Sequence, residues 1–195
     1  MMRCWFYTLL ALASVAVASA QDSVYTVEVV GVGGVQITKY NEPPTEQSTT
    51  DVFTGSAFLG RVLWRPDHLL AVGLQSGYQT FSEEVFKTPG SQGTVDLGAR
   101  LTGIPVQLVL SMHPGDFDVG VGLGLYVLQA VWRADDVQRV SSSATEFGVH
   151  MWVGYDVQLL DRLSVGPELS LHVLSNRGVA ALNAGLRVRF DVIRY

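Results

Sequence analysis

The sequence is poor in cysteine and in charge. Its single cysteine, Cys4, lies within the first twenty residues. Residues 21–195 therefore contain no thiol, which excludes disulfides and thiolate metal ligands from this part of the chain. Charged residues make up only 16% of the sequence, and the formal net charge is −5. Because nucleic-acid binding depends on basic surfaces, we expect no nucleic-acid partner.

Residues 1–20 have the pattern of a cleaved signal peptide. Arg3 supplies a positive charge near the start, and residues 9–18 form an apolar run that only Ser14 interrupts. Ala18-Ser19-Ala20 then places small residues where signal peptidase reads them, before Gln21. The run is too short for a membrane-spanning helix. We therefore expect an exported protein whose mature domain covers residues 21–195.

The mature domain also lacks a long hydrophobic run. Hydrophobic residues make up 48% of the sequence and there are 20 glycines, yet no apolar stretch in residues 21–195 reaches the length of a helical span. In hydrocarbon every backbone polar group must be paired internally, so only helices and closed barrels cross a membrane. An exported, apolar, glycine-rich chain without a helical span therefore indicates a membrane β-barrel.

Residues 117–132 carry the clearest strand signal. The odd positions from Phe117 to Val127 are apolar, whereas Asp118 is followed on the even positions by Gly120, Gly122 and Gly124. Strict alternation predicts a strand. A glycine-rich second face is expected where side chains from facing strands must fit into a narrow lumen. We therefore expect the apolar face to point towards lipid.

Similar alternation gives eight strands in all. They cover residues 25–37, 52–64, 70–78, 97–110, 117–132, 147–159, 163–173 and 180–192. In 97–110 the apolar positions change parity at Thr102-Gly103, which predicts a β-bulge there. Tight turns alternate with longer polar connections at 41–50, 82–94 and 133–145, although the last connection, at 175–178, is short. This pattern is typical of an antiparallel transmembrane barrel with turns at one end and loops at the other.

With this topology, residues 21–195 resemble the small outer-membrane β-barrel proteins, the OmpA-, OmpX- and PorT-like barrels. Ile104-Pro105-Val106 begins an apolar half-strand, and residues 163–169 (LSVGPEL) follow a tight turn. The chain ends in an aromatic residue, Tyr195, after Phe190 and Ile193. The resemblance implies an outer-membrane location among outer-membrane lipids. It also implies that Phe190, Ile193 and Tyr195 form the signal that the barrel-assembly machinery recognises.

Charged residues recur on the faces expected to point inward. They are Glu28, Arg61, Asp156, Glu168, Arg187 and Arg189. The interior of an eight-stranded barrel is just filled by its own side chains. We therefore interpret these residues as a buried ion-pair network that plugs the lumen, in preference to a selectivity filter.

The leading functional hypothesis is an integral outer-membrane protein without enzymatic activity. It would have a structural or surface-interaction role, with segments 41–50, 82–94 and 133–145 open to a surface ligand. We expect no cofactor, and the four histidines show no metal-ligand spacing.

Two alternatives remain. One is a lipid-modifying enzyme, because residues 172–176 (HVLSN) are similar to the His-x-Ser-Asn motif of the lipid A deacylases, with one residue too many. On a strand, that odd step places His172 and Ser175 on opposite faces. The other is a secreted calycin-like carrier of apolar ligands, which would turn its apolar face inward.

Overall fold

The computed structural model describes residues 25–41, 52–66, 69–90, 93–134, 138–175 and 178–194. The predicted signal peptide, Tyr195 and most of segment 41–50 lie outside the described residues.

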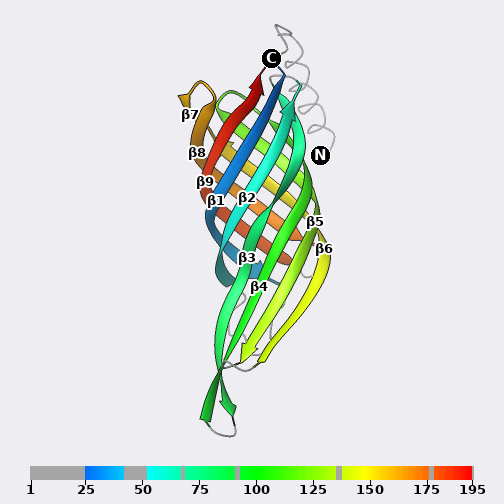
Figure 1. Cartoon of the computed structure of the whole chain (residues 1–195), viewed down its shortest axis with the longest axis vertical. Helices are drawn as coiled ribbons and strands as arrows, with labels where there is room; N and C mark the ends of the chain where they lie inside the picture. Colours follow the sequence, from blue (N-terminus) through cyan, green and yellow to red (C-terminus); the bar gives the residue numbers. More distant parts are fainter. Residues whose placement is uncertain are drawn as a thin grey trace, which may run out of the picture.

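Within the described residues, nine antiparallel strands form one sheet that closes into a barrel (Figure 1). They are β1 (Thr26–Tyr40), β2 (Val52–Arg65), β3 (Leu70–Gly90), β4 (Gly93–Met112), β5 (Phe117–Ala134), β6 (Gln138–Tyr155), β7 (Val157–Leu160), β8 (Leu163–Leu174) and β9 (Val179–Arg194). Strand β9 pairs with β1, and β6 pairs with β8, which closes the ring. Only Asp156 separates β6 from β7, and both pair with β8. They therefore share one position in the wall, and the predicted eight-stranded barrel is confirmed.

The outer face of the wall is apolar, whereas the inner face carries the buried polar and charged residues together with two apolar clusters. Leu123 and Leu125 of β5 are each 50% exposed, whereas Asp118 and Tyr126, on the other face of the same strand, are fully buried. This is the arrangement that a lipid-facing barrel requires, and it is the reverse of a calycin-like carrier. No helix in the described part of the chain is long and apolar enough to cross a membrane.

The two ends of the barrel differ (Figure 1). At the end that we call the turn end, β1 begins, β9 ends, and the connections at 113–116 and 161–162 are short. At the opposite end, the hairpin end, β3 and β4 stay paired as far as Gly90 and Gly93. Strands β5 and β6 likewise stay paired as far as Ala134 and Gln138.

The prediction that 82–94 and 133–145 are loops was therefore wrong, because most of these residues belong to strands. Where burial is described beyond the wall, neighbouring residues on opposite faces are at least partly exposed, as Glu84 and Val85 and also Val140 and Ser141 are. The sequence there does not need alternation between apolar and polar residues, and so it carries no strand signal.

The bulge predicted at Thr102-Gly103 lies in the neighbouring strand instead. The register between β3 and β4 shifts between Thr80 and Ser82, which makes Phe81 the extra residue. Strand β4 itself pairs with β5 without interruption. The apolar positions change parity in the sequence because Leu101 points inward, where it joins an apolar cluster in the interior.

Candidate functional site

The most concentrated chemistry in the molecule lies in the lumen near the turn end. Arg187, on β9, is fully buried and places its Nη1 2.6 Å from Oδ2 of Asp118 and its Nε 3.3 Å from Oδ1 of Asp156. Asp156 also faces Arg189, with 3.0 Å between its Oδ2 and Nη1 of the arginine. Two arginines of one strand are thus neutralised by carboxylates from β5 and from the break between β6 and β7.

A second ion pair crosses the lumen between β2 and β8. Arg61 donates hydrogen bonds from both terminal nitrogens to the two carboxylate oxygens of Glu168, and from Nε to Gln75. Its guanidinium also lies over the ring of Trp152, 4.1 Å from the ring centroid. Both charged side chains are fully buried. A bidentate, stacked arginine is held in one orientation, so this pair acts as a rigid cross-brace.

A third group of side chains lies at the turn-end mouth of the lumen. Arg65 lies 2.8 Å from Oε1 of Glu28 and donates a hydrogen bond to Nδ1 of His113, also at 2.8 Å. Because Nδ1 accepts that bond, the imidazole is neutral in this arrangement. Burial lowers the pKa of His113 to about 3, against the opposing influence of nearby Asp118.

A ladder of stacked rings occupies the middle of the lumen. His150 stacks on Trp152 at 5.0 Å and on His172 at 4.1 Å between ring centroids. Tyr126 contacts Nδ1 of His172 through its hydroxyl, at 2.8 Å. Amides of buried glutamines border the same rings, with Gln75 bonded to His150. This layer has polar groups but carries no paired charge.

Apolar side chains gather in the lumen towards the hairpin end. Beyond the ring ladder, one buried cluster brings together residues from several strands: Tyr40, Phe53, Phe81, Leu101, Tyr126, Leu128, Leu174, Val179 and Ala181. Phe81, the bulged residue, is fully buried and packs edge-on against Tyr126. We call this cluster the apolar plug.

Glycines make room for the largest lumen side chains. A β-carbon at Gly120 would overlap the ring of Trp152, and one at Gly154 would overlap the guanidinium of Arg187. The glycine-rich face of residues 117–132 therefore leaves space for bulky side chains from other strands. A large inward residue thus lies beside a glycine of another strand at both positions.

All six sequence-predicted lumen residues lie inside the barrel. Glu28, Arg61, Asp156, Glu168 and Arg187 are buried, and Arg189 is partly buried at the turn end. Of the predicted assembly signal, Phe190 and Ile193 point outward, 47% and 39% exposed, and Tyr195 lies outside the described residues.

Sequence reasoning left three charged or titratable residues out of this network. Asp118 was visible on the inward face of its strand. Arg65 and His113 lie just beyond the predicted strands 52–64 and 97–110, yet each continues the inward parity of the strand that precedes it. Continuing the inward–outward alternation of each strand into the connection that follows it would have identified both residues.

The residues that resemble a hydrolase motif do not come together. His172 is fully buried against Gln79 and Tyr126, whereas Ser175 is exposed and donates its hydroxyl hydrogen bond to the carbonyl oxygen of Phe147. The odd sequence step thus separates them, as predicted. Among the described residues, no group of three or more His, Cys, Asp or Glu side chains could hold a metal ion.

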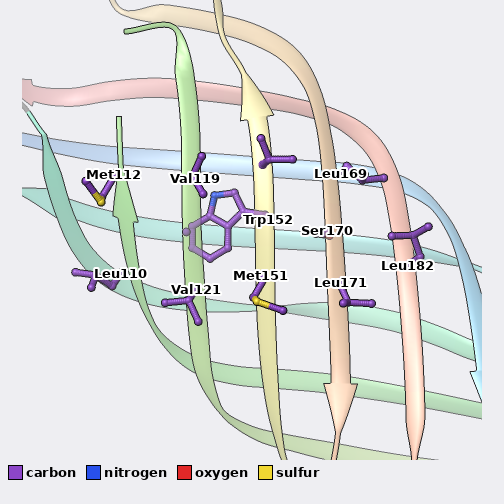
Figure 2. A pocket seen from close by; sticks show the side chains of 12 residues that line it. Leu110, Met112, Val119, Val121, Met151, Trp152, Leu169, Ser170, Leu171 and Leu182 are labelled. Atoms are coloured by element: carbon purple, nitrogen blue, oxygen red, sulfur yellow. The ribbon is translucent and has the colours of Figure 1, made fainter. Parts of the chain in front are cut away.

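A shallow apolar groove of about 510 Å³ runs across the outside of the wall. Figure 2 shows two rows of outward side chains from β4, β5, β6, β8 and β9, one including Met112 and Val119 and the other Leu110 and Val121. The backbone at Trp152 lies between the rows. Hydrocarbon fits this surface, and polar ligands do not.

Comparisons with known proteins agree with this architecture. The family model of the outer membrane protein beta-barrel domain matches residues 8–190. No curated protein matches the chain in sequence.

Several solved structures are similar in fold. Ail, the attachment invasion locus protein of Yersinia pestis, solved with the heparin analogue sucrose octasulfate, is 11% identical with a TM-score of 0.52, over 87% of this chain and 100% of its own. A major outer membrane protein of Thermus thermophilus is 13% identical, also with a TM-score of 0.52, over 87% and 100%. Neisserial surface protein A is 12% identical with a TM-score of 0.51, over 87% and 97%.

Three observations support the same conclusion. They are the apolar outer face of the wall, the short turns at one end of the barrel, and the family match. This chain is a bacterial outer-membrane protein, and it belongs to the outer membrane protein beta-barrel domain family.

Proposed function

We propose that this protein is a non-enzymatic surface protein of the outer membrane, in which a plugged barrel anchors a projecting sheet that contacts ligands outside the cell. The observation that supports the proposal is the set of buried side chains that meet inside the barrel. Ion pairs occupy its turn-end half, stacked rings its middle, and the apolar plug its hairpin end. A barrel filled in this way serves as a rigid support and gives ions no open passage.

The projecting sheet consists of the parts of β3, β4, β5 and β6 that extend beyond the closed wall. Strand β2 stops pairing with β3 at Gln79, and β8 stops pairing with β6 at Gly148. Beyond those points, β4 and β5 remain paired as far as Leu97 and Ala134, so the four strands continue as one sheet. We place this end outside the cell, because outer-membrane barrels have short turns on the periplasmic side.

One of the structural neighbours supports a surface role. The solved structure of Ail is described as that of an attachment protein and contains a heparin analogue. At 11% identity the likeness extends to the fold alone. It nevertheless supports the proposal, because a protein of similar fold binds a ligand of this kind.

Two measurements test the proposal. Purified protein in planar bilayers should give no large, steady conductance, and cells that display it should bind more strongly to epithelial monolayers than cells without it. Steady porin-like currents would contradict the plugged lumen. Unchanged cell binding would contradict the surface role.

Lipid A deacylation distinguishes the enzymatic alternative. Purified protein in lipid A-containing vesicles should release no fatty acid above the background of empty vesicles. Release that depends on His172 and Ser175 would replace our proposal with a hydrolase. Such an enzyme would need the strand to reorganise, since these side chains now point apart.

A further inference from the structure

A polar cavity of about 290 Å³ lies at the turn end of the barrel, between the ends of β1, β2, β8 and β9. We call it the vestibule. Every side chain that lines it is polar, and most of them carry a charge. Because we place the turn end on the periplasmic side, the vestibule faces the periplasm. The proposed surface role, which concerns the opposite end of the barrel, makes no use of it.

Two arginines of the vestibule are held in place by carboxylates. Nη2 of Arg65 lies 2.8 Å from Oε1 and 2.9 Å from Oε2 of Glu28. Nη1 of Arg189 lies 3.0 Å from Oδ2 of Asp156. Each guanidinium still has an unused donor, because the buried Nε of Arg65 and the buried Nε of Arg189 have no hydrogen-bond partner among the described residues. These donors add positive potential to the inner wall of the vestibule, which therefore attracts an oxyanion.

The rim of the vestibule carries further charges of both signs. Arg162, Arg194 and Asp161 are exposed, and Asp191 is half-buried. In the described part of the chain, none of these four side chains forms an ion pair. Asp191 also lies directly opposite Glu28 in the pairing of β9 with β1. Like charges directly opposite each other are destabilising, so a positive group beside Asp191 would relieve their repulsion.

We propose that the vestibule binds a small zwitterionic solute. The oxyanion of the solute, a carboxylate or a phosphate, lies against Arg65 and Arg189, and its ammonium group lies beside Asp191. Guanidinium groups match the geometry of both oxyanions. At about 290 Å³ the vestibule is smaller than the roughly 300–1,000 Å³ of pockets for drug-sized ligands, which suits a solute the size of an amino acid or a dipeptide.

The balance of charge in the vestibule disfavours ligands of a single sign. Its four arginines are offset by four carboxylates, those of Glu28, Asp161, Asp191 and, behind the lining, Asp156. A polyanion would meet the carboxylates, and a metal cation would meet the arginines. Juxtaposed like charges reduce affinity and reject such partners. A solute with both signs can satisfy both sets of charges.

The direct test uses the full-length protein in maltoside micelles and three probes of similar size. They are glycylglycine, a zwitterion, N-acetylglycine, an anion, and glycylglycinamide, a cation. We expect glycylglycine to shift the Nε–H resonances of Arg65 and Arg189 saturably in NMR spectra. The other two probes should bind about tenfold more weakly, because each lacks one charge-assisted interaction. The Nε–H of Arg61, which already donates to Gln75, should not move and serves as an internal control.

Phosphoethanolamine distinguishes the two sources of such a zwitterion. Tighter binding of phosphoethanolamine than of glycylglycine would assign the vestibule to a phospholipid headgroup, and the reverse order would assign it to an amino acid or peptide. Either order supports a zwitterion site. If neither probe gives a saturable shift, as expected when only water enters the vestibule, the proposal is overturned. Equal affinity for glycylglycine and N-acetylglycine would also overturn it.

Asp191→Asn tests the assignment of the two signs. The variant should bind glycylglycine about tenfold more weakly and N-acetylglycine no more weakly than the wild type does, because only the ammonium group loses its partner. An equal loss for both probes would contradict the proposed orientation of the solute. Arg162→Gln, in an exposed turn, should weaken both probes and provides a second test if Asp191→Asn fails to fold. Arg100→Gln removes an exposed arginine from β4 and, as the matched control, should change neither affinity.

Discussion

Arg61 and Glu168 are buried in the lumen and compensate each other's charge. Glu168→Gln would leave the guanidinium buried without its counter-charge. We expect the free energy of unfolding to fall by about 3–5 kcal/mol, measured by urea titration in lipid vesicles. The double variant Arg61→Met with Glu168→Met should recover most of the loss, because it removes both charges. Equal instability of the single and double variants would show that packing, and not charge compensation, is lost.

A substitution at Gly120 tests whether glycines on the inner face of the wall make room for Trp152. A β-carbon at this position overlaps the indole, whereas one at the outward-facing Gly31 meets nothing within 4 Å. Gly120→Ala should therefore lower stability by about 1–3 kcal/mol, the usual cost of overpacking. Gly31→Ala, the same chemical change in another strand, should be neutral or slightly stabilising. The pair can be compared by urea unfolding, and equal effects would refute the packing argument.

His113 should make the barrel sensitive to acid. Its pKa is lowered by burial to about 3, against 6.5 for an unperturbed histidine. Between these values the unfolded chain binds a proton that the folded chain does not, so stability is greatest above pH 6.5 and falls as the pH drops towards 3.

His113→Gln should flatten this part of the stability–pH curve, because glutamine does not titrate. The carboxylates of Asp118 and Asp156 and the guanidinium of Arg65 stay in place in both proteins and serve as a common background. Identical curves for variant and wild type would exclude His113 as the cause.

Among the elements, the bulge in β3 has the clearest role. It turns Phe81 into the lumen, where this side chain packs against Tyr126 in the apolar plug. Phe81→Ala should therefore open the hairpin end and raise the frequency of small conductance events in planar bilayers. Phe58→Ala, which removes a ring from the outer face, should leave conductance at the wild-type level. An unchanged Phe81→Ala recording would mean that the ion pairs alone close the barrel.

The elements also mark where sequence reasoning stopped. Strand β5 was recognisable because lipid on one side and a tight lumen on the other require different residues at odd and even positions. The continuation of β3 through Glu83 and Glu84 was not recognisable, because both of its faces are outside the wall and neither requires apolar residues. Tertiary pairing with β4, and not local pattern, holds that segment as a strand.

For the whole molecule, the difference between the two ends predicts orientation. A peptide tag inserted between Ala134 and Gln138, at the tip of the β5–β6 hairpin, should be reached by antibody on intact cells. A tag at Gly115, in a short turn at the other end, should become accessible only after the outer membrane is permeabilised. Labelling in the reverse order would invert the proposed orientation of the barrel.

The sequence by itself determined the class of the protein, the number of wall positions and the inward or outward direction of most strand residues. These properties are local, because each residue alternates between two environments along its own strand. Only the tertiary structure decided which charges meet. Arg61 and Glu168 are separated by 107 positions, and Arg187 reaches Asp118 from the far end of the chain. Their heights in the lumen depend on the stagger with which the sheet closes, a property of all the strands together that no single segment encodes.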